Sequence, residues 1–345
     1  MAGVGESVVE QSREMPTLDE VARVAGVSRS TASRAINGQV YVSAKAREAV
    51  TNAVASLGYS PNLLARSLAT KRTNSIALVL SERGDTVLAD PFFARVLRGV
   101  HAGLSGSGMQ LVLLMAQDEQ AQGELGQYLC AGHVDGALVV SLHGDDPLPD
   151  QLASSGLPVV LLGRPLAKVD VPYVDADNST GGELAAAHLV ERGRRHIATI
   201  AGPRDMAAGI DRLSGWRRGM TAAKRRPAGV VHADFTAAGG AAAMRELLAA
   251  HPEVDGVFAA SDLMAVGAMQ VLREAGRRIP QDVAVVGFDD SELAETAVPP
   301  LTSVRQPIEE MGRAITLRLI AQINAVADQP SSVLLPTELV PRESS

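Results

Sequence analysis

Residues 28–37, SRSTASRAIN, concentrate hydrogen-bond donors in one short segment. Arg29, Ser30 and Arg34 offer guanidinium and hydroxyl groups, while few apolar residues such as Ala32 remain to pack inward. Such groups on the first turns of an exposed helix can donate to base edges and phosphates in a DNA major groove. The alternative interpretation is an ordinary helical hairpin with a solvated, charged face.

The elements that would position this segment can be predicted from local signals. Thr17 and Glu20 form a capping box, so a first helix begins at Thr17 and carries an apolar stripe. Gly26 can end that helix in a left-handed conformation, and Ser28 can cap the next one. The pattern therefore predicts a helix-turn-helix.

A third helix completes a compact unit over residues 17–60. Ser43 can cap it, its apolar residues recur at helical spacing, and Gly58 follows its last turn. Residues 61–72 then form a linker that contains about two helical turns, well below the roughly 12 to 15 residues that an isolated helix needs. We expect this linker to be disordered on its own.

Three runs in order, GVSRSTASRAIN, VSAKAREAV and LGYSPNLLARSLAT, resemble the headpiece and hinge of the LacI/GalR family of bacterial repressors. The resemblance implies a recognition helix in the major groove. It also implies hinge segments from two subunits that fold together on operator DNA and open a central minor-groove step with a leucine.

Residue by residue, the resemblance assigns base-reading or base-adjacent positions to Arg29, Ser30 and Arg34, and the minor-groove leucine to Leu68. Asn62 and Ala65 would face the minor groove from the hinge. For Thr17, Ser28 and Thr31, phosphate contacts and helix capping are about equally expected. The complete set of expected DNA-binding residues is Thr17, Ser28, Arg29, Ser30, Thr31, Arg34, Asn37, Asn62, Ala65 and Leu68.

The charge distribution supports a DNA-binding N-terminal part. The first 72 residues contain nine Lys and Arg against six Asp and Glu, whereas the other 273 contain 23 against 33. Because the field at a DNA surface is local, the net charge of −7 for the whole chain does not exclude a nucleic-acid partner.

Beyond residue 72 the pattern changes to short apolar runs that alternate with helical segments, which is typical of parallel sheets covered on both faces. Two such βα halves predict two doubly wound lobes with a ligand cleft beyond the carboxyl ends of their strands. The expected strands are 75–81, 109–115, 136–141, 158–162, 196–201, 229–232, 256–260 and 283–288.

This body resembles the periplasmic sugar-binding-protein fold that the LacI/GalR family joins to its headpiece. The markers are DPFFARVLRG, GPRDMAAGIDRLSGWRRG, ASDLMAVGAM, VAVVGFDDSELA and PPLTSVRQP. The resemblance implies a core over residues 73–345. Its first lobe would comprise about 73–174 and 305–330, and its second lobe about 175–304 and 331–345, with residues 333–340 ending in the second lobe.

The resemblance also implies an effector site in the cleft. Arg212 would be a guanidinium clamp for hydroxyls or a carboxylate, Asp289 an acceptor for hydroxyls, and Phe235 an aromatic against the ligand ring. The expected effector-binding residues are Asp90, Phe92, Phe93, Arg212, Phe235, Ser261 and Asp289.

Structural alternatives remain for several of these residues. Arg212 could form an interlobe ion pair with Asp289 or Asp262 without ligand, and Phe92 and Phe93 could both be core residues. Asp262 is expected to cap a helix that begins at Leu263 rather than bind ligand. Gly215 and Trp216 are expected to serve packing.

Two departures from the family pattern affect the expected pocket. Ser261 stands where an asparagine is common, so one ligand contact could be absent or mediated by water. Arg164, after Gly163, stands where some sugar-responsive members carry a carboxylate, which leaves a ligand with a carboxylate or phosphate open.

No catalytic or cofactor motif emerges from the sequence. Gly103, Gly106 and Gly108 follow a helix and precede a strand, the wrong order for a phosphate-binding loop, and the seven histidines lack metal-ligand spacing. The single cysteine, Cys130, excludes an intrachain disulfide and is expected to be a buried thiol in a reducing compartment.

Residues 1–16 contain no apolar run, so we expect a disordered extension, no export signal, and no membrane span elsewhere. The sequence therefore predicts a cytoplasmic, nucleoid-associated homodimer that binds a palindromic operator and responds to a small polar effector, a sugar or a sugar derivative. No cofactor is expected. The alternative is a solute-binding protein without DNA function.

Overall fold

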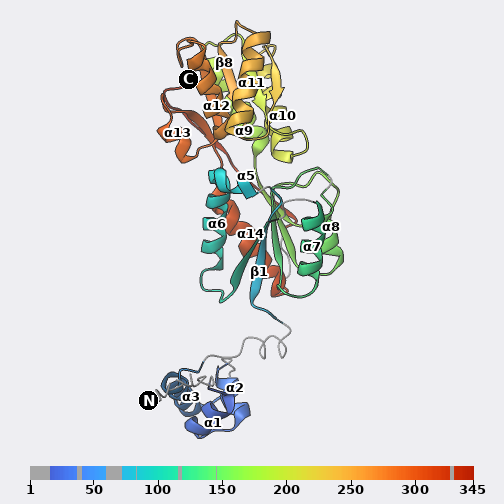
Figure 1. Cartoon of the computed structure of the whole chain (residues 1–345), viewed down its shortest axis with the longest axis vertical. Coiled ribbons are helices and arrows are strands. Elements are labelled where there is room, and N and C mark those ends of the chain that lie inside the picture. The colour runs from blue at the N-terminus through green and yellow to red at the C-terminus, as the bar shows by residue number, and fades with distance from the viewer. Residues whose placement is uncertain are drawn as a thin grey trace, which may run out of the picture. The chain divides into compact units, whose positions relative to one another are not determined.

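The structure is a computed structural model that describes residues 16–36, 41–59, 72–82, 84–115, 119–144, 146–326 and 330–345. It divides the chain into two compact units, residues 1–72 and 73–345 (Figure 1). Asn37, Asn62, Ala65 and Leu68 lie outside the described residues. Among the described residues, no helix is long and apolar enough to span a bilayer.

The first unit contains three helices, α1 (Leu18–Ala25), α2 (Arg29–Ile36) and α3 (Ala44–Leu57). The capping box of Thr17 and Glu20 is confirmed, and Gly26 ends α1 with a φ of 66°. Ser43 caps α3 and Gly58 ends it. The helices enclose a small core of Val21, Ala22, Ala32, Val50 and Ala53.

The second unit contains two six-stranded sheets, which confirms the predicted pair of doubly wound lobes. The first sheet has the order β11-β5-β4-β3-β1-β2, and the second has the order β12-β10-β9-β8-β6-β7. All paired strands are parallel except β10 and β12.

The elements of the first lobe are β1 (Ser75–Leu80), α5 (Gly84–Ala89), α6 (Pro91–Leu104), β2 (Gln110–Met115), α7 (Glu119–Cys130), β3 (Ala137–Val140), α8 (Leu148–Ser154), β4 (Val159–Leu162), β5 (Tyr173–Ala176), α14 (Ile308–Ile323) and β11 (Ser332–Leu335). Those of the second lobe are α9 (Asn178–Glu191), β6 (Ile197–Ala201), α10 (Ala207–Ala222), β7 (Val230–His232), α11 (Ala237–Ala250), β8 (Gly256–Ala259), α12 (Asp262–Glu274), β9 (Ala284–Asp289), α13 (Glu292–Thr296), β10 (Thr302–Arg305) and β12 (Glu338–Val340).

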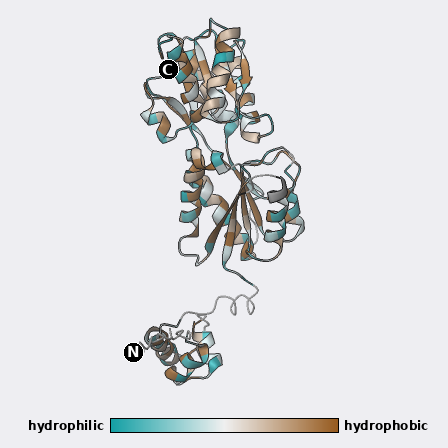
Figure 2. Cartoon of the chain, in the orientation of Figure 1, coloured by the Kyte–Doolittle hydropathy of each residue, from teal (hydrophilic) through white to brown (hydrophobic). Residues whose placement is uncertain are grey.

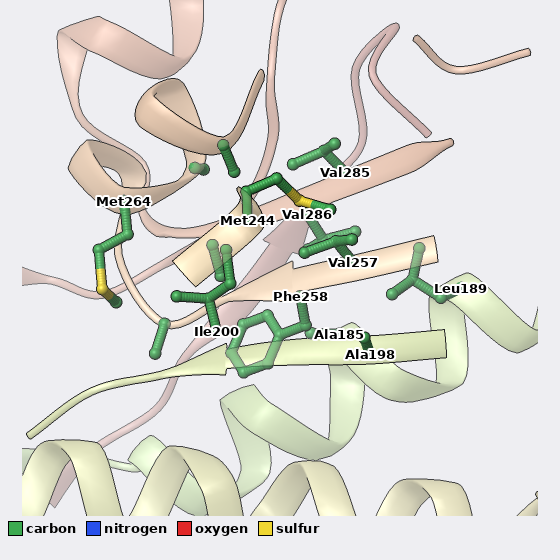
Figure 3. Packing of buried hydrophobic residues seen from close by; sticks show 14 of the residues in the cluster. Ala185, Leu189, Ala198, Ile200, Met244, Val257, Phe258, Met264, Val285 and Val286 are labelled. Atoms are coloured by element: carbon green, nitrogen blue, oxygen red, sulfur yellow. The ribbon is translucent and has the colours of Figure 1, made fainter. Parts of the chain in front are cut away.

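Both faces of each sheet are covered, as the continuous apolar strands predict. In β1, Ile76, Leu78 and Leu80 pack toward α6 and α14, while Ala77 and Val79 pack toward α7 and α8. The strands of the first sheet are correspondingly brown in Figure 2, where the surrounding helices also carry teal residues. Figure 3 shows the second lobe, where Val257 and Phe258 point to opposite faces of β8.

The connections between the lobes correct one predicted boundary. The resemblance implies that residues 331–345 belong to the second lobe, but Ser332–Leu335 pairs in parallel with β5 of the first sheet. Only the following strand, β12, joins the second sheet. Each of these strands has at most four residues, too short for a periodicity to show which sheet it joins.

Two further predictions were wrong. Cys130 is exposed at the end of α7, because the buried residues of that helix turn are its neighbour Leu129 and Leu125. Asp262 does not cap α12, because the helix begins one residue earlier and Ser261 caps it by accepting from the amide of Met264. The carboxylate of Asp262 instead accepts hydrogen bonds from Ser291 and Ser303.

Candidate functional site

Helix α2 presents a polar, largely exposed face. Arg29, Ser30 and Arg34 are exposed, while Ala32 is completely buried against the other helices. Arg29 forms a solvent-exposed ion pair with Asp19, at 3.5 Å between Nε and Oδ1. Such a pair contributes little, about 0 to 1 kcal/mol, so the guanidinium can leave it for another acceptor.

The remaining polar residues near α2 have structural roles. Ser28 Oγ accepts from the amide of Thr31 at 3.1 Å and lies 2.8 Å from the Thr31 hydroxyl. Thr17 both accepts from Glu20 and donates its amide to the Glu20 carboxylate at 2.7 Å. These bonds account for the capping interpretation, and contact of the same residues with DNA stays a prediction.

In the core, a cavity of about 570 Å³ lies between the two lobes. It is of the size typical of small-molecule sites, about 300 to 1000 Å³. The structure places all seven predicted effector residues around it, namely Asp90, Phe92, Phe93, Arg212, Phe235, Ser261 and Asp289.

Close packing of α9 against α10 fixes the position of Arg212. A Cβ on Gly215 would overlap the Ser179 carbonyl oxygen, and a Cβ on Gly182 would overlap the Arg212 carbonyl oxygen, so only glycine permits this approach. Trp216, fully buried, fills the space beside them. The predicted packing roles of Gly215 and Trp216 are thus confirmed.

The guanidinium of Arg212 is buried and held from several sides. Nε donates to Asn178 Oδ1 at 2.8 Å, Nη1 donates to the Ala260 carbonyl at 2.6 Å, and the group lies 3.7 Å from the centre of the Phe288 ring. Arg212 lines the cavity, and its Nη2 has no hydrogen-bond partner among the described residues. The guanidinium therefore keeps Nη2 as a donor for a ligand in the cavity.

Asp289 is the acceptor partner at this end of the cavity. Its Oδ1 accepts from Gln306 Nε2 at 2.6 Å and lies 3.4 Å from Arg212 Nη1. The alternative is therefore confirmed in part: Arg212 and Asp289 form an ion pair without ligand, but the pair is not interlobe, because both residues belong to the second lobe. Burial raises the pKa of Asp289, and the charge of Arg212 opposes that rise.

Aromatic side chains form the apolar part of the wall. Phe235 adopts a left-handed backbone conformation, with φ 63°, and its ring packs so closely on Gly202 that a Cβ there would overlap it. Phe92 and Phe93 stack edge to face at 5.3 Å. Phe93 is 7 % exposed and belongs to the core of the first lobe, whereas Phe92 is half-buried.

Asp90 lines the first-lobe side and also caps α6, where its carboxylate accepts from the amide of Phe92 at 2.9 Å. Burial, together with the negative charge of Asp289, raises the pKa of Asp90 to about 7. The group can therefore act as a hydrogen-bond donor or as an acceptor near neutral pH.

The sequence did not single out Glu82, His143 or Asp205, which form a chain across the cleft. His143 Nε2 lies 2.8 Å from Glu82 Oε1 in the first lobe, and Nδ1 lies 2.9 Å from Asp205 Oδ2 in the second. The hydrogen bond to Glu82 and the one to Asp205 raise the pKa of His143 to about 9, although burial opposes them. Glu82 and His143 follow β1 and β3, so the rule that ligands bind beyond strand ends could have found them.

A second interlobe bridge corrects the interpretation of Arg164. Its guanidinium donates to both carboxylate oxygens of Asp211, at 2.9 to 3.2 Å, across the cleft. Because this charge is already paired, Arg164 does not make the cavity favourable for an anion. The carboxyl groups of Asp90 and Asp289, the buried guanidinium of Arg212 and the aromatic rings instead favour a neutral ligand rich in hydroxyl groups.

Comparison with known proteins agrees with this architecture. Residues 17–62 match the bacterial regulatory proteins of the lacI family, and residues 186–345 match a periplasmic binding protein-like domain. The HTH-type transcriptional regulator CelR of Thermobifida fusca is 50% identical over 338 residues, which cover 97% of this chain and 99% of that protein.

Two solved structures show the same fold. A transcriptional regulator CelR–cellobiose complex is 49% identical and covers 96% of this chain and 100% of its own, with a TM-score of 0.77. A lac repressor dimer bound to operator and the anti-inducer ONPF is 29% identical and covers 96% and 99%, with a TM-score of 0.84.

A helix-turn-helix unit followed by a two-lobed core with an interlobe cavity is the architecture of a transcriptional regulator with a ligand-binding domain. The chain belongs to the lacI family of bacterial regulatory proteins. Its relatives are regulators and not enzymes, and the family excludes the alternative of a solute-binding protein without DNA function.

Proposed function

We propose that this regulator binds a palindromic operator as a homodimer and is controlled by a sugar in the interlobe cavity, specifically a β-linked glucose disaccharide such as cellobiose. The observation that carries the proposal is the cavity itself, where Arg212 donates, Asp289 and Asp90 accept, and Phe235 offers a ring face. The regulator with 49% identity in complex with cellobiose supports this ligand class.

On the DNA side, α2 would enter the major groove. Arg29, Ser30 and Arg34 would read base edges, because they are the exposed polar residues of that helix. Asn37, together with the hinge residues Asn62, Ala65 and Leu68, is assigned by the family pattern alone. We propose residues 17–60 as the DNA-binding domain, 61–72 as the hinge and 73–345 as the sensor.

Exposed apolar side chains on the first lobe support the homodimer. Leu97 on α6 and Leu113 and Met115 on the edge strand β2 are 39 to 44% exposed. A second copy with the same surface can cover such residues through a two-fold contact. The lac repressor of similar fold is a dimer on its operator.

Binding and release of DNA would be coupled through the two lobes. The bridges His143–Asp205 and Arg164–Asp211 join the lobes across the cleft, so a ligand that changes the closure of the cavity also changes the geometry of the first lobes. The two hinges, residues 61–72 of each subunit, lead directly into the first lobes. A shift of the first lobes would therefore bring the hinges to, or move them from, the separation at which they pair on DNA. This regulation would take place in the cytoplasm.

Isothermal titration calorimetry tests the sugar assignment. We expect the full chain to bind cellobiose and to bind maltose, the α-linked isomer, more weakly. Phe235→Ala should weaken cellobiose binding, because the ring face is lost, while the exposed Arg218→Met control should not. Absence of heat with both disaccharides, from protein that still binds DNA, would refute the ligand class and leave the DNA-binding role intact.

A further inference from the structure

Arg95, on α6 of the first lobe, reaches the backbone that carries the ligand acceptor Asp289. Its Nη1 donates to the Asp289 carbonyl at 3.0 Å and to the Asp290 carbonyl at 3.2 Å, both in the second lobe. Its Nε and Nη2 donate to the two carboxylate oxygens of Glu309, each at 2.9 Å, at the start of α14. One side chain therefore joins α6, α14 and the end of β9.

The segment whose carbonyls accept from Arg95, Asp289–Asp290, has a strained backbone. Asp289 and Asp290 have φ values of 108° and 49°, a conformation that residues with side chains seldom adopt. Such strain persists only where the surroundings hold it, and it is frequent at ligand clamps and switches. A ligand that pulls on the Asp289 carboxylate therefore acts on a segment whose carbonyls are bound to the first lobe.

Helices α6 and α14 form a rigid pair that can carry this signal. A Cβ on Gly99 would overlap the Glu309 carbonyl oxygen, and a Cβ on Gly312 would come within 2.6 Å of the Val96 carbonyl oxygen. The two backbones therefore move together. Gln306, two residues before α14, donates to the Asp289 carboxylate, and Glu309 in the first turn of α14 is linked through Arg95 to the Asp289 carbonyl.

The other interlobe bridges differ from this one. Arg164–Asp211 and His143–Asp205 connect side chains at the rim and touch neither Asp289 nor its backbone. Loss of a rim bridge would change how far the cleft closes, whereas loss of the Arg95 contact would disconnect the ligand acceptor from α6.

We propose that Arg95 is a positioning residue that transmits occupancy of the cavity from Asp289 to helices α6 and α14, and so couples the sugar to the affinity for operator DNA. This inference rests on the proposed function. Arg95 does not line the cavity, so its role is to connect the site and not to bind the sugar.

The test compares Arg95→Ala with Arg98→Ala. Arg98 donates to the same Glu309 oxygen, at 3.1 Å, but makes no contact with Asp289 or Asp290, so it is a matched control. For each full-length protein, fluorescence anisotropy gives the operator affinity with and without saturating cellobiose, and calorimetry gives the sugar affinity. Arg95→Lys, which keeps the charge but lacks the planar fork, is measured in parallel.

We expect the wild type to show a sugar-dependent change in operator affinity of about 5- to 150-fold, the usual range of allosteric coupling. Arg95→Ala should still bind operator and cellobiose, but the ratio of its operator affinities with and without the sugar should be near one. Arg95→Lys should show an intermediate ratio, and Arg98→Ala should show the wild-type ratio. If Arg95→Ala does not fold, Arg95→Lys and Glu309→Gln replace it, with reduced ratios expected for both.

The outcomes separate the inference from the proposed function. A wild-type ratio retained in the Arg95 variants, or lost equally in Arg98→Ala, would overturn the role of Arg95 while leaving the sugar response established. A wild type that binds operator without any response to a disaccharide would overturn the proposed function, and this inference with it.

Discussion

Replacement of Arg212 by methionine should cost a large part of the stability of the second lobe. The substitution leaves the buried oxygens of Asn178 and Ala260 without their donor, which costs about 1 to 3 kcal/mol for each unsatisfied group. It also leaves the buried carboxylate of Asp289 without its positive partner, and breaking such a pair costs about 3 to 5 kcal/mol.

These contributions do not add fully, because methionine also removes the cost of burying the guanidinium. Burial lowers the pKa of Arg212, because the apolar surroundings disfavour its charged form. We therefore expect a loss of about 3 to 5 kcal/mol in the free energy of unfolding at pH 8. Arg218→Met on the same helix, where the exposed Arg218 pairs with the exposed Glu183, should cost less than about 1 kcal/mol.

The stability deficit of Arg212→Met should depend on pH in a direction that the pKa of Asp289 determines. In the wild type, burial raises the pKa of Asp289 while Arg212 lowers it, so removal of Arg212 raises the folded-state pKa further. A carboxyl whose folded-state pKa lies above its unfolded value gains stability as the pH falls and the group takes up a proton. The deficit of Arg212→Met should therefore be smaller at pH 5 than at pH 8.

Urea unfolding followed by tryptophan fluorescence measures this deficit. Trp216 is the single tryptophan of the chain and is completely buried in α10, so its signal reports the second lobe. A deficit below about 1 kcal/mol, within the range of a surface pair, would refute the reasoning. So would a deficit that grows as the pH falls.

Three further predictions follow from particular contacts. Arg29→Ala should change which operator bases are preferred in a sequence selection, and a uniform loss over all sequences would instead make Arg29 a phosphate contact. Gly215→Ala should destabilise the core by at least about 1 to 3 kcal/mol in thermal unfolding, because its Cβ overlaps the Ser179 carbonyl, whereas Gly123→Ala, with open space around it, should not. Cellobiose affinity should fall as the pH rises from 7 to 10, because His143 loses its proton near pH 9 and with it the ionic bridge to Asp205. In a His143→Gln variant the cellobiose affinity should depend less on pH. Equal pH dependence of the affinity in the two proteins would contradict the role of the bridge.

The sequence predicts those parts of the fold that local signals determine. Capping residues such as Thr17, Ser43 and Gly58 act within one helical turn, so the headpiece helices were predicted to within a residue or two. The bounds of the apolar strands were also predicted to within a residue or two. The four-residue strands β5 and β11 were missed or misplaced because polar residues, Asp175 and Ser332, shorten their apolar runs, and because β11 pairs with a strand distant in the chain.

In the candidate site, too, some features could be predicted from the sequence and others could not. Residues on a family motif, such as Arg212 and Asp289, could be placed beside the cavity in advance. The interlobe contacts of Arg95, His143 and Arg164 could not be predicted, because each has a partner on the other lobe and the contact depends on how the lobes meet. Contacts between the two lobes leave no periodic trace in either segment.

The most direct test of the central claim is a fluorescence anisotropy titration of the full chain against a palindromic site obtained by random selection, at fixed salt, with and without cellobiose. We predict specific binding and a change in affinity of about 5- to 150-fold on addition of the sugar. Selection of no preferred site, or an operator affinity that stays the same while calorimetry shows the sugar bound, would contradict it.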